Sequence, residues 1–277
     1  MSPDAFGPAE AEIRKRFYSG RPQARPFVVG LCGAQGSGKS TLAEALQQHF
    51  AAEGVRTVVL SLDDLYLPKA DRERLAAEVH PLLRTRGVPG THDVALGLAV
   101  IEALGETGTI DLPRFDKSVD DCLPSGTGTV TGPVELVLLE GWCVGAAAED
   151  EGRLIEPVNR LEREDDPDGA WRRYVNQALA GSYQALFARL DMLVLLAAPS
   201  FDVVARWRLE QEAALRARLL AAGQDVSGLM DEAGVQRFVS HYERITRHIL
   251  REMPGRADLT IALTEDRKIQ AARWAPD

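Results

Sequence analysis

Short apolar runs alternate along this chain with longer stretches in which apolar residues have helical spacing. Five runs rich in branched side chains predict buried strands, at residues 27–32, 58–62, 134–139, 192–197 and 259–263. Helical spacing predicts helices at residues 41–52, 94–104, 171–190, 201–220 and 235–250. Continuous apolar strands separated by helices are typical of a parallel sheet that is covered on both faces. The pattern therefore predicts one α/β domain over residues 26–277, preceded by a helix and loop at residues 1–25.

The composition is that of an ordinary globular protein. Of the 277 residues, 45% are hydrophobic and 26% are charged, and the formal net charge is -9. No apolar run approaches the roughly 20 residues of a membrane-spanning helix, and the charged N-terminus does not resemble a signal peptide. The acidic balance argues against nucleic acid or a membrane as a partner. Three widely separated cysteines without metal-binding spacing fit a cytoplasmic protein, and nothing in the sequence sets the oligomeric state.

A phosphate-binding loop follows the first predicted strand. Residues 33–40 match the pattern G-x-x-x-x-G-K-[ST] without a gap. Glycines let successive backbone N–H groups face phosphate oxygens, and the helix that begins there adds its positive end. We expect Lys39 to reach the terminal phosphates of a nucleotide and Ser40 to ligate Mg²⁺. The predicted nucleotide-binding residues are Gly33, Ala34, Gln35, Gly36, Ser37, Gly38, Lys39, Ser40 and Thr41.

Acidic residues follow two other predicted strands. Asp63 and Asp64 come directly after residues 58–62, and Glu140 comes after residues 134–139. Because the carboxyl ends of parallel strands meet at one edge of a sheet, these side chains can approach the terminal phosphate. One carboxylate could accept the proton of a substrate hydroxyl and the other could hold Mg²⁺, or these acids could simply cap helices. We predict catalytic and metal-binding roles for Asp63 and Glu140.

Two missing patterns favour ATP over GTP. The chain has no Asn-Lys pair, so it lacks the N-K-x-D motif that reads guanine. The third predicted strand is followed by Glu-Gly, where a GTPase would have D-x-x-G. We therefore expect ATP and Mg²⁺ to be used together.

Six segments occur in an order that resembles a known kinase family. They are GAQGSGKST at residues 33–41, SLDDLYL at 61–67, RGVPGTHD at 86–93, PRFDKS at 113–118, LEGWCVG at 139–145 and FDVVARWRLEQE at 201–212. The set resembles D-glycerate 3-kinase of the plant and fungal type, within the P-loop kinases that include phosphoribulokinase, uridine kinase and pantothenate kinase. Ser40, Leu65 and Phe115 depart mildly from that family, where Thr, Phe and Tyr are commoner.

The resemblance implies a P-loop NTPase-type sheet of about five parallel strands, a helical lid, and phosphorylation of D-glycerate to 3-phosphoglycerate by Mg-ATP. Asp63 falls where the wider group has its catalytic aspartate, and Arg206 and Arg208 fall in the lid helix. These two arginines diverge by about 200° on a helix, so both cannot face one phosphate; we predict Arg206 as the catalytic one. The alternatives are another hydroxyl acceptor (pantothenate, a nucleoside or a sugar phosphate) or a non-enzymatic ATP-binding switch.

Basic residues in irregular stretches are the candidates for holding the acceptor. Residues 68–91, 113–133 and 162–169 show no regular pattern, and loops of this length are usually functional or mobile. Glycerate carries one carboxylate and two hydroxyls, so its site needs cations, and Arg is suited to bidentate capture of a carboxylate. Each candidate could also be an ordinary solvated charge. We predict four acceptor-binding residues in addition to Asp63: Arg86, His92, Arg114 and Lys117.

Overall fold

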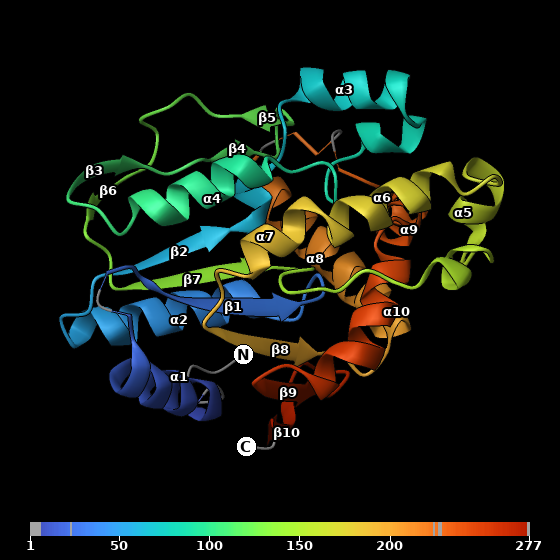
Figure 1. Ribbon diagram of the computed structural model, residues 1–277. Helices are drawn as coiled ribbons and strands as arrows, with labels where there is room; N and C mark the ends of the chain where they lie inside the picture. Colours follow the sequence, from blue (N-terminus) through green and yellow to red (C-terminus); the bar gives the residue numbers. More distant parts are fainter. Residues whose placement is uncertain (1–6, 23, 224, 227–228, 276–277) are drawn as a thin grey trace.

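The computed structural model describes residues 7–22, 24–223, 225–226 and 229–275, and a six-stranded sheet runs through its centre (Figure 1). In spatial order the strands are β10 (Ile269–Trp274), β9 (Leu259–Leu263), β8 (Met192–Ala197), β1 (Phe27–Gly33), β7 (Leu136–Gly141) and β2 (Thr57–Ser61). Strands β2, β7, β1, β8 and β9 are parallel, and β10 pairs antiparallel with β9. The five predicted strands and the α/β class are confirmed. The edge strand β10 was not predicted, because its side chains are mostly half-exposed and show no apolar run.

Helices cover both faces of the sheet (Figure 1). On one face the apolar side chains belong to α1 (Gly7–Gly20), α2 (Lys39–Ala52), α8 (Phe201–Ala221) and α9 (Glu232–Ser240). On the other face they belong to α4 (Val94–Ala103), α6 (Ala170–Ala180), α7 (Ser182–Phe187) and α10 (Glu243–Glu252). The remaining helices are short: α3 (Lys69–Glu78), α5 (Arg160–Asp165), and the 3-10 turns η2 (Leu62–Leu65), η3 (Pro81–Arg84), η4 (Glu151–Leu154) and η5 (Met253–Gly255).

Two predicted helices are interrupted. The predicted helix at residues 171–190 is divided into α6 and α7 by Gly181, whose φ of -97° and ψ of -108° are not helical. The predicted helix at residues 235–250 is likewise divided into α9 and α10. Apolar spacing continues across both junctions, so the hydrophobic pattern alone did not reveal them.

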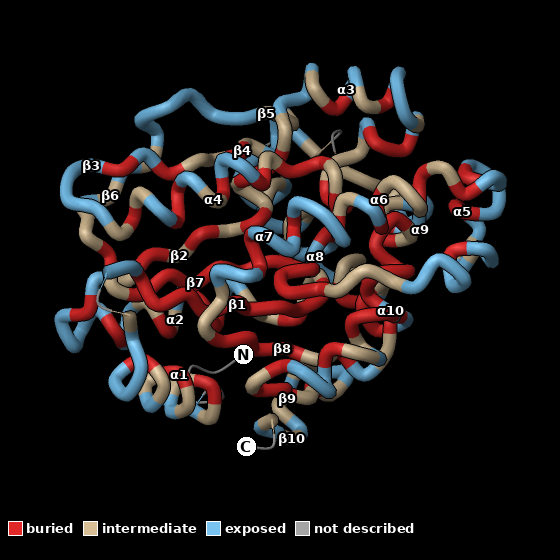
Figure 2. Tube along the Cα trace, in the orientation of Figure 1, coloured by how far each residue is buried: buried red, intermediate tan, exposed pale blue. Residues whose placement is uncertain are grey.

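All three predicted irregular stretches contain regular structure, and α5 covers residues 162–165 of the third. Residues 68–91 hold α3 and η3, and residues 113–133 hold three short strands of two hairpins. One hairpin pairs β4 (Phe115–Asp116) with β5 (Asp121–Cys122), and the other pairs β3 (Gly108–Asp111) with β6 (Thr129–Gly132). Their exposed positions, pale blue in Figure 2, give these elements too few apolar residues to produce a periodic signal.

The helix predicted within residues 1–25 is α1, which packs on the same face of the sheet as α2, near the C-terminal end of that helix. Its Ala9, Ile13 and Phe17 are fully buried, and the Phe17 ring lies 5.6 Å from the Phe50 ring of α2. The division of the chain at residue 25 stays a prediction. Among the described residues, no helix combines the length and the apolar character that crossing a bilayer requires.

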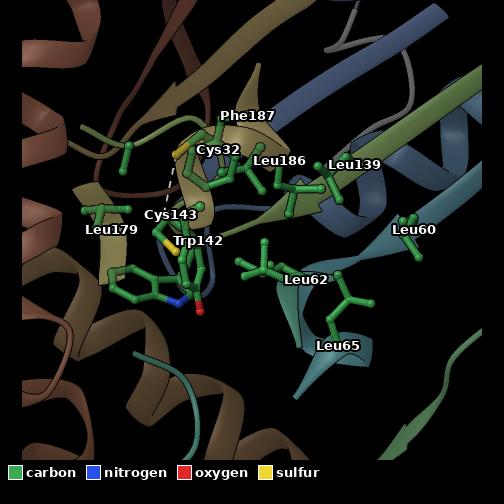
Figure 3. Close-up of a cluster of buried hydrophobic side chains, with 14 of the residues drawn as sticks. Cys32, Leu60, Leu62, Leu65, Leu139, Trp142, Cys143, Leu179, Leu186 and Phe187 are labelled. Atoms are coloured by element: carbon green, nitrogen blue, oxygen red, sulfur yellow. Dashed lines mark hydrogen bonds between the residues drawn. The ribbon is translucent and has the colours of Figure 1, made fainter. Parts of the chain in front are cut away.

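A leucine cluster fixes the carboxyl ends of β2 and β7. Leu60 and Leu139 from the two strands pack in one buried cluster with Leu62 and Leu65 of η2 and with Leu186 of α7 (Figure 3). Two free cysteines lie in the same cluster, and Cys32 Sγ donates to the Trp142 carbonyl at 3.4 Å, the dashed line in Figure 3. The third cysteine, Cys122, is exposed and also free. The polar side chains that follow the strands are therefore held on a rigid base.

Candidate active site

The phosphate loop forms the turn between β1 and α2. Gly36 and Gly38 have φ of 78° and 89°, in the left-handed region that favours glycine. A Cβ on Gly36 would also lie 2.8 Å from Trp207 Cβ, so a side chain there would displace α8. Gly38 is the N-cap of α2, and no side chain in the described part of the chain caps this helix. Its first N–H groups therefore remain available to a phosphate.

The segment between β9 and β10 contacts the phosphate loop. Arg267, between β9 and β10, donates from Nε to the Gly36 carbonyl at 2.9 Å, and its guanidinium lies 5.2 Å from the Trp207 ring centre. Trp207 in turn donates from Nε1 to the Glu265 carbonyl at 2.7 Å. Sequence reasoning missed these residues, because nothing in their local pattern connects them with a loop more than 160 positions away.

Glu140 lies at the end of β7, next to the start of α2. It is 6% exposed, and its Oε1 accepts hydrogen bonds from Ser61 Oγ at 2.7 Å and Ser40 Oγ at 3.4 Å. Lys39 Nζ is 3.9 Å from Oε2, and Oε2 has no hydrogen-bond partner among the residues that the structure describes. A buried carboxylate oxygen without such a partner, beside a serine hydroxyl, is a donor set that suits Mg²⁺.

These residues fit a magnesium ion only as part of its coordination shell. No group of three or more His, Cys, Asp or Glu side chains in the described ranges could hold a metal ion by itself. Mg²⁺ is usually held by one or two carboxylates together with water and substrate phosphates. The site therefore fits an ion that arrives with a nucleotide, with Ser40 and Glu140 as protein ligands.

Asp63 lies in η2, directly after β2, and its carboxylate accepts two short hydrogen bonds. Lys117 Nζ is 2.6 Å from Oδ2, and the Tyr66 hydroxyl is 2.6 Å from Oδ1. Burial alone would raise the pKa of Asp63, but the charges of Lys117 and Lys39 and these two hydrogen bonds outweigh it and lower the pKa to about 2. In this arrangement Asp63 is a firmly ionised carboxylate with a cation in contact.

Arg86 and Lys117 reach the same cleft from different segments. Arg86 follows η3, and one of its Nη atoms pairs with Oδ1 of Asp120. Lys117 lies in the turn between β4 and β5, where the Asp116 carboxylate accepts from the backbone N–H of Ser118 at 2.8 Å. One cation, Lys117, is thus in contact with the carboxylate of Asp63, and a second, Arg86, lines the same cleft.

One polar cleft of about 290 Å³ contains both halves of this arrangement. Gln35, Gly36, Lys39 and Ser40 line it from the phosphate loop, and Ser61, Asp63, Glu140 and Trp142 line it from the strand ends. Tyr66, Arg86 and Lys117 line it from the loops, and Arg208, Gln211, Phe238 and Tyr242 line it from α8, α9 and the α9–α10 junction. Tyr66 and Trp142 fall in the sequence segments noted above, but neither was selected as a site residue.

Two predicted acceptor ligands do not line the cleft. Arg114 pairs with Asp64, with Nη1 2.8 Å from Oδ2, and both residues lie outside the lining. His92 is only 5% exposed; its ring stacks on Tyr66, and its Nδ1 is 2.5 Å from the Tyr183 hydroxyl. Burial lowers the pKa of His92 to about 4, against the opposing charge of Asp63, so the ring is neutral. His92 therefore lies behind Tyr66.

The two arginines of the expected lid helix lie on opposite sides of α8. Arg206, the predicted choice, is half-exposed and points away from the cleft, with Nη1 3.1 Å from Glu265 Oε2. Arg208 lines the cleft, with Nη2 2.7 Å from Glu212 Oε2 and its guanidinium 5.8 Å from the Phe238 ring centre. The two positions do diverge as expected, and the geometry favours Arg208 over Arg206 as the lid arginine, a choice that helical spacing alone could not make.

Comparison with known proteins places this geometry in a family. The chain is 37% identical over 232 residues to the uncharacterized kinase mug58 of Schizosaccharomyces pombe, covering 80% of each protein. It is 31% identical over 230 residues to chloroplastic D-glycerate 3-kinase of Arabidopsis thaliana, which covers 78% of this chain but only 46% of the plant protein. A model of the methylmalonyl Co-A mutase-associated GTPase MeaB matches only residues 13–66, the region around the phosphate loop.

A solved structure extends the similarity over the whole fold. The D-glycerate 3-kinase of Cryptococcus neoformans is 25% identical and superposes with a TM-score of 0.74, covering 98% of this chain and 97% of that one. The chain therefore belongs to the same family of P-loop kinases as the Schizosaccharomyces pombe kinase, and it is a phosphotransferase that uses an alcohol group as acceptor.

Proposed function

We propose that this kinase transfers the γ-phosphoryl group of ATP to the 3-hydroxyl of D-glycerate and forms 3-phosphoglycerate. The observation that carries the proposal is that two cations, Lys117 in contact with Asp63 and Arg86, line the same cleft as the phosphate loop. A small acceptor with one carboxylate matches such a site, because Arg and Lys both form charge-assisted hydrogen bonds with a carboxylate. The family relationship to D-glycerate 3-kinases supports the same acceptor.

The nucleotide half of the proposed site holds Mg-ATP. The backbone amides of residues 33–40 and the Lys39 ammonium bind the triphosphate, and Ser40, Glu140 and Asp63, which line the same cleft, would hold the metal. A magnesium ion held there by Ser40 and Glu140 would supply positive charge against the charge that develops on the phosphates. Arg208 approaches from α8 and stabilises the transferring group, and the aromatic side chains of Phe238 and Tyr242 help to exclude water.

The acceptor half of the proposed site orients and deprotonates the alcohol. The acceptor oxygen forms the new bond to the γ-phosphorus while the bond to the ADP oxygen breaks, and Asp63 takes the hydroxyl proton. In the unliganded arrangement Lys117 blocks this role by holding Asp63 as a weakly basic carboxylate. We propose that the acceptor carboxylate draws the Lys117 ammonium away, which restores the basicity of Asp63 only when an acceptor is present.

A panel of alcohols tests the proposal. ADP release is measured with D-glycerate, L-glycerate, glycerol, pantothenate and uridine, and phosphorus NMR identifies the phosphorylated oxygen. We expect D-glycerate to give the highest kcat/KM and glycerol, which lacks the carboxylate, to be weaker by about 10²-fold or more, because two charge-assisted contacts are lost. Equal rates with glycerol, or a higher kcat/KM with pantothenate or uridine, would contradict D-glycerate as the acceptor.

A further inference from the structure

An arginine of α3 is buried although most of its helix is exposed. Only Arg72 and Ala76 of α3 are buried, and Arg72 is 1% exposed. Burying a guanidinium costs free energy unless its N–H groups are paired, and an apolar side chain would fill such a position at lower cost. The contacts of Arg72 should therefore explain why an arginine is used there.

The guanidinium of Arg72 joins three separate segments. Nε donates to the Leu67 carbonyl at 3.1 Å, just after η2, and Nη1 donates to the Arg84 carbonyl at 2.9 Å, at the end of η3. Nη2 donates to the Asp120 carbonyl at 2.7 Å and lies 3.1 Å from Asp120 Oδ2. Arg72 does not line the cleft. All of its polar contacts are thus with the segments that surround the acceptor half.

Each of these segments carries one of the acceptor-side groups. Leu67 follows the turn that holds Asp63, Arg84 precedes Arg86 by two positions, and Asp120 follows Lys117 by three. The Asp120 carboxylate contacts Arg72 with one oxygen and Arg86 with the other. Both guanidiniums also lie near the Phe115 ring, at 5.8 Å and 5.6 Å from its centre. The position of Arg86 is therefore linked to Arg72 through one shared anion and one shared ring.

We propose that Arg72 is the positioning residue of the acceptor half, fixing Arg86 and the Lys117 hairpin relative to Asp63 without touching the substrate. The proposal rests on the proposed function for its kinetic consequence. A guanidinium can satisfy three carbonyls and a carboxylate at fixed angles, whereas a lysine ammonium has three donors and no planar fork. The phosphate loop shares none of these contacts, so the effect of losing Arg72 is confined to the acceptor.

Kinetics with Arg72→Lys provide the first test, with Arg74→Gln as a matched control. Arg74 lies on the same helix, but its side chain is 63% exposed and it pairs only with Asp71. We expect Arg72→Lys to raise the KM for D-glycerate about tenfold or more, the effect of losing one or two charge-assisted hydrogen bonds, while the KM for Mg-ATP changes less than twofold. Arg74→Gln should change neither. An equal rise of both KM values, or no rise, would overturn the proposal.

Two further measurements keep the test independent of folding and of acceptor identity. Asp120→Asn retains the carbonyl partners of Arg72 but removes the shared charge, and we expect a rise of roughly threefold in acceptor KM. Hydrogen exchange without any acceptor should accelerate in Arg72→Lys at residues 84–92 and 115–122, but not at 33–42. If D-glycerate is not the best acceptor in the panel, the proposed function is wrong. The hydrogen-exchange result still tests the role of Arg72 in that case. Uniform acceleration would reduce Arg72 to a general stabilising residue and overturn the proposal.

Discussion

The nucleotide half and the acceptor half of the cleft are constructed in different ways. The phosphate-binding part of the nucleotide half comes from one continuous segment, residues 33–41, in which two left-handed glycines and the start of α2 present backbone amides. The acceptor half brings Asp63, Arg86 and Lys117 together from three segments through ion pairs and side-chain hydrogen bonds. Backbone geometry is robust to most substitutions outside the loop, whereas a set of side chains depends on residues that never meet the ligand. Variants in the two halves should therefore fail in different ways.

The largest effect is expected from Asp63→Asn, which removes the proposed base and leaves the phosphate loop intact. General base catalysis contributes typically about 10²–10⁴-fold, so we expect kcat to fall on the order of 10³-fold, with the affinity for Mg-ATP changed less than threefold. Calorimetry and ADP release measure the two quantities. Asp64→Asn is the matched control, because Asp64 pairs with Arg114 outside the cleft and should change kcat far less. If kcat stays within tenfold of the parent value, Asp63 is not the base, and either Glu140 or no side chain has that role.

The converse variant, Lys39→Met, removes the one charged side chain of the phosphate loop. Losing a single preorganised donor to a developing charge costs about 10²–10³-fold in kcat, and we expect the affinity for Mg-ATP to fall as well. Lys268→Met, at the far end of the β9–β10 turn, is the control for loss of a lysine. If Lys39→Met turns over at the parent rate, this loop does not bind the phosphates of the nucleotide.

The contrast between the halves explains how much of the site the sequence predicts. The phosphate loop is a local motif whose conformation follows from its own glycines, so its residues can be assigned from spacing alone. Asp63 and Glu140 could be placed because a buried parallel strand fixes the edge at which it ends. In both cases the information lies within about ten residues of the functional group.

The acceptor half was predicted only in part. Lys117 and Arg86 line the cleft as expected, but Arg114 turns to Asp64 and His92 is buried behind Tyr66. These outcomes depend on which carboxylate or ring lies opposite each side chain, and those partners are up to 91 positions distant in sequence. The same limit applies to the fold, where the breaks at Gly181 and between α9 and α10 are set by tertiary packing.

An intermediate effect is expected where the lid helix meets the nucleotide half. Arg208→Gln removes a cation from the cleft, and we expect kcat to fall about 30-fold, the value of a charged hydrogen bond made during transfer. Arg206→Gln is the paired variant, because Arg206 faces Glu265 outside the cleft and should change kcat less than twofold. Steady-state kinetics of the two variants measure both values of kcat. A larger fall in kcat for Arg206→Gln than for Arg208→Gln would identify Arg206 as the lid residue.

A smaller effect on turnover, but a distinct one, is expected from Lys117→Met. The acceptor KM should rise about tenfold because one charged contact is lost. Removing Lys117 also removes an opposing charge and a hydrogen bond from Asp63, so the pKa of that carboxyl rises from about 2 and its basicity increases. We therefore expect ATP hydrolysis without acceptor to increase about threefold. Lys69→Met, on the nearby α3, is the matched control. An unchanged rate of ATP hydrolysis in Lys117→Met would show that Lys117 does not limit the basicity of Asp63.

The smallest effect on turnover is expected from His92, whose importance lies in stability. Burial lowers its pKa in the folded state to about 4, whereas an unfolded histidine titrates near 6.5. The unfolded chain therefore binds a proton first as the pH falls, so this contribution to stability is complete above about pH 6.5 and is lost progressively down to about pH 4. Burial also lowers the pKa values of His241 and His248, so they too destabilise the fold as the pH falls below about 6.5.

The variant His92→Gln isolates one of these three contributions. The parent should lose about 2 kcal/mol between pH 7 and pH 4.5 through His92 alone, and the variant should lose that much less over the same interval. Urea unfolding at the two pH values gives the difference, and the acceptor KM at pH 7 should stay within threefold because His92 does not line the cleft. A tenfold rise in that KM with unaltered pH dependence of stability would return His92 to the acceptor half, where the sequence had placed it.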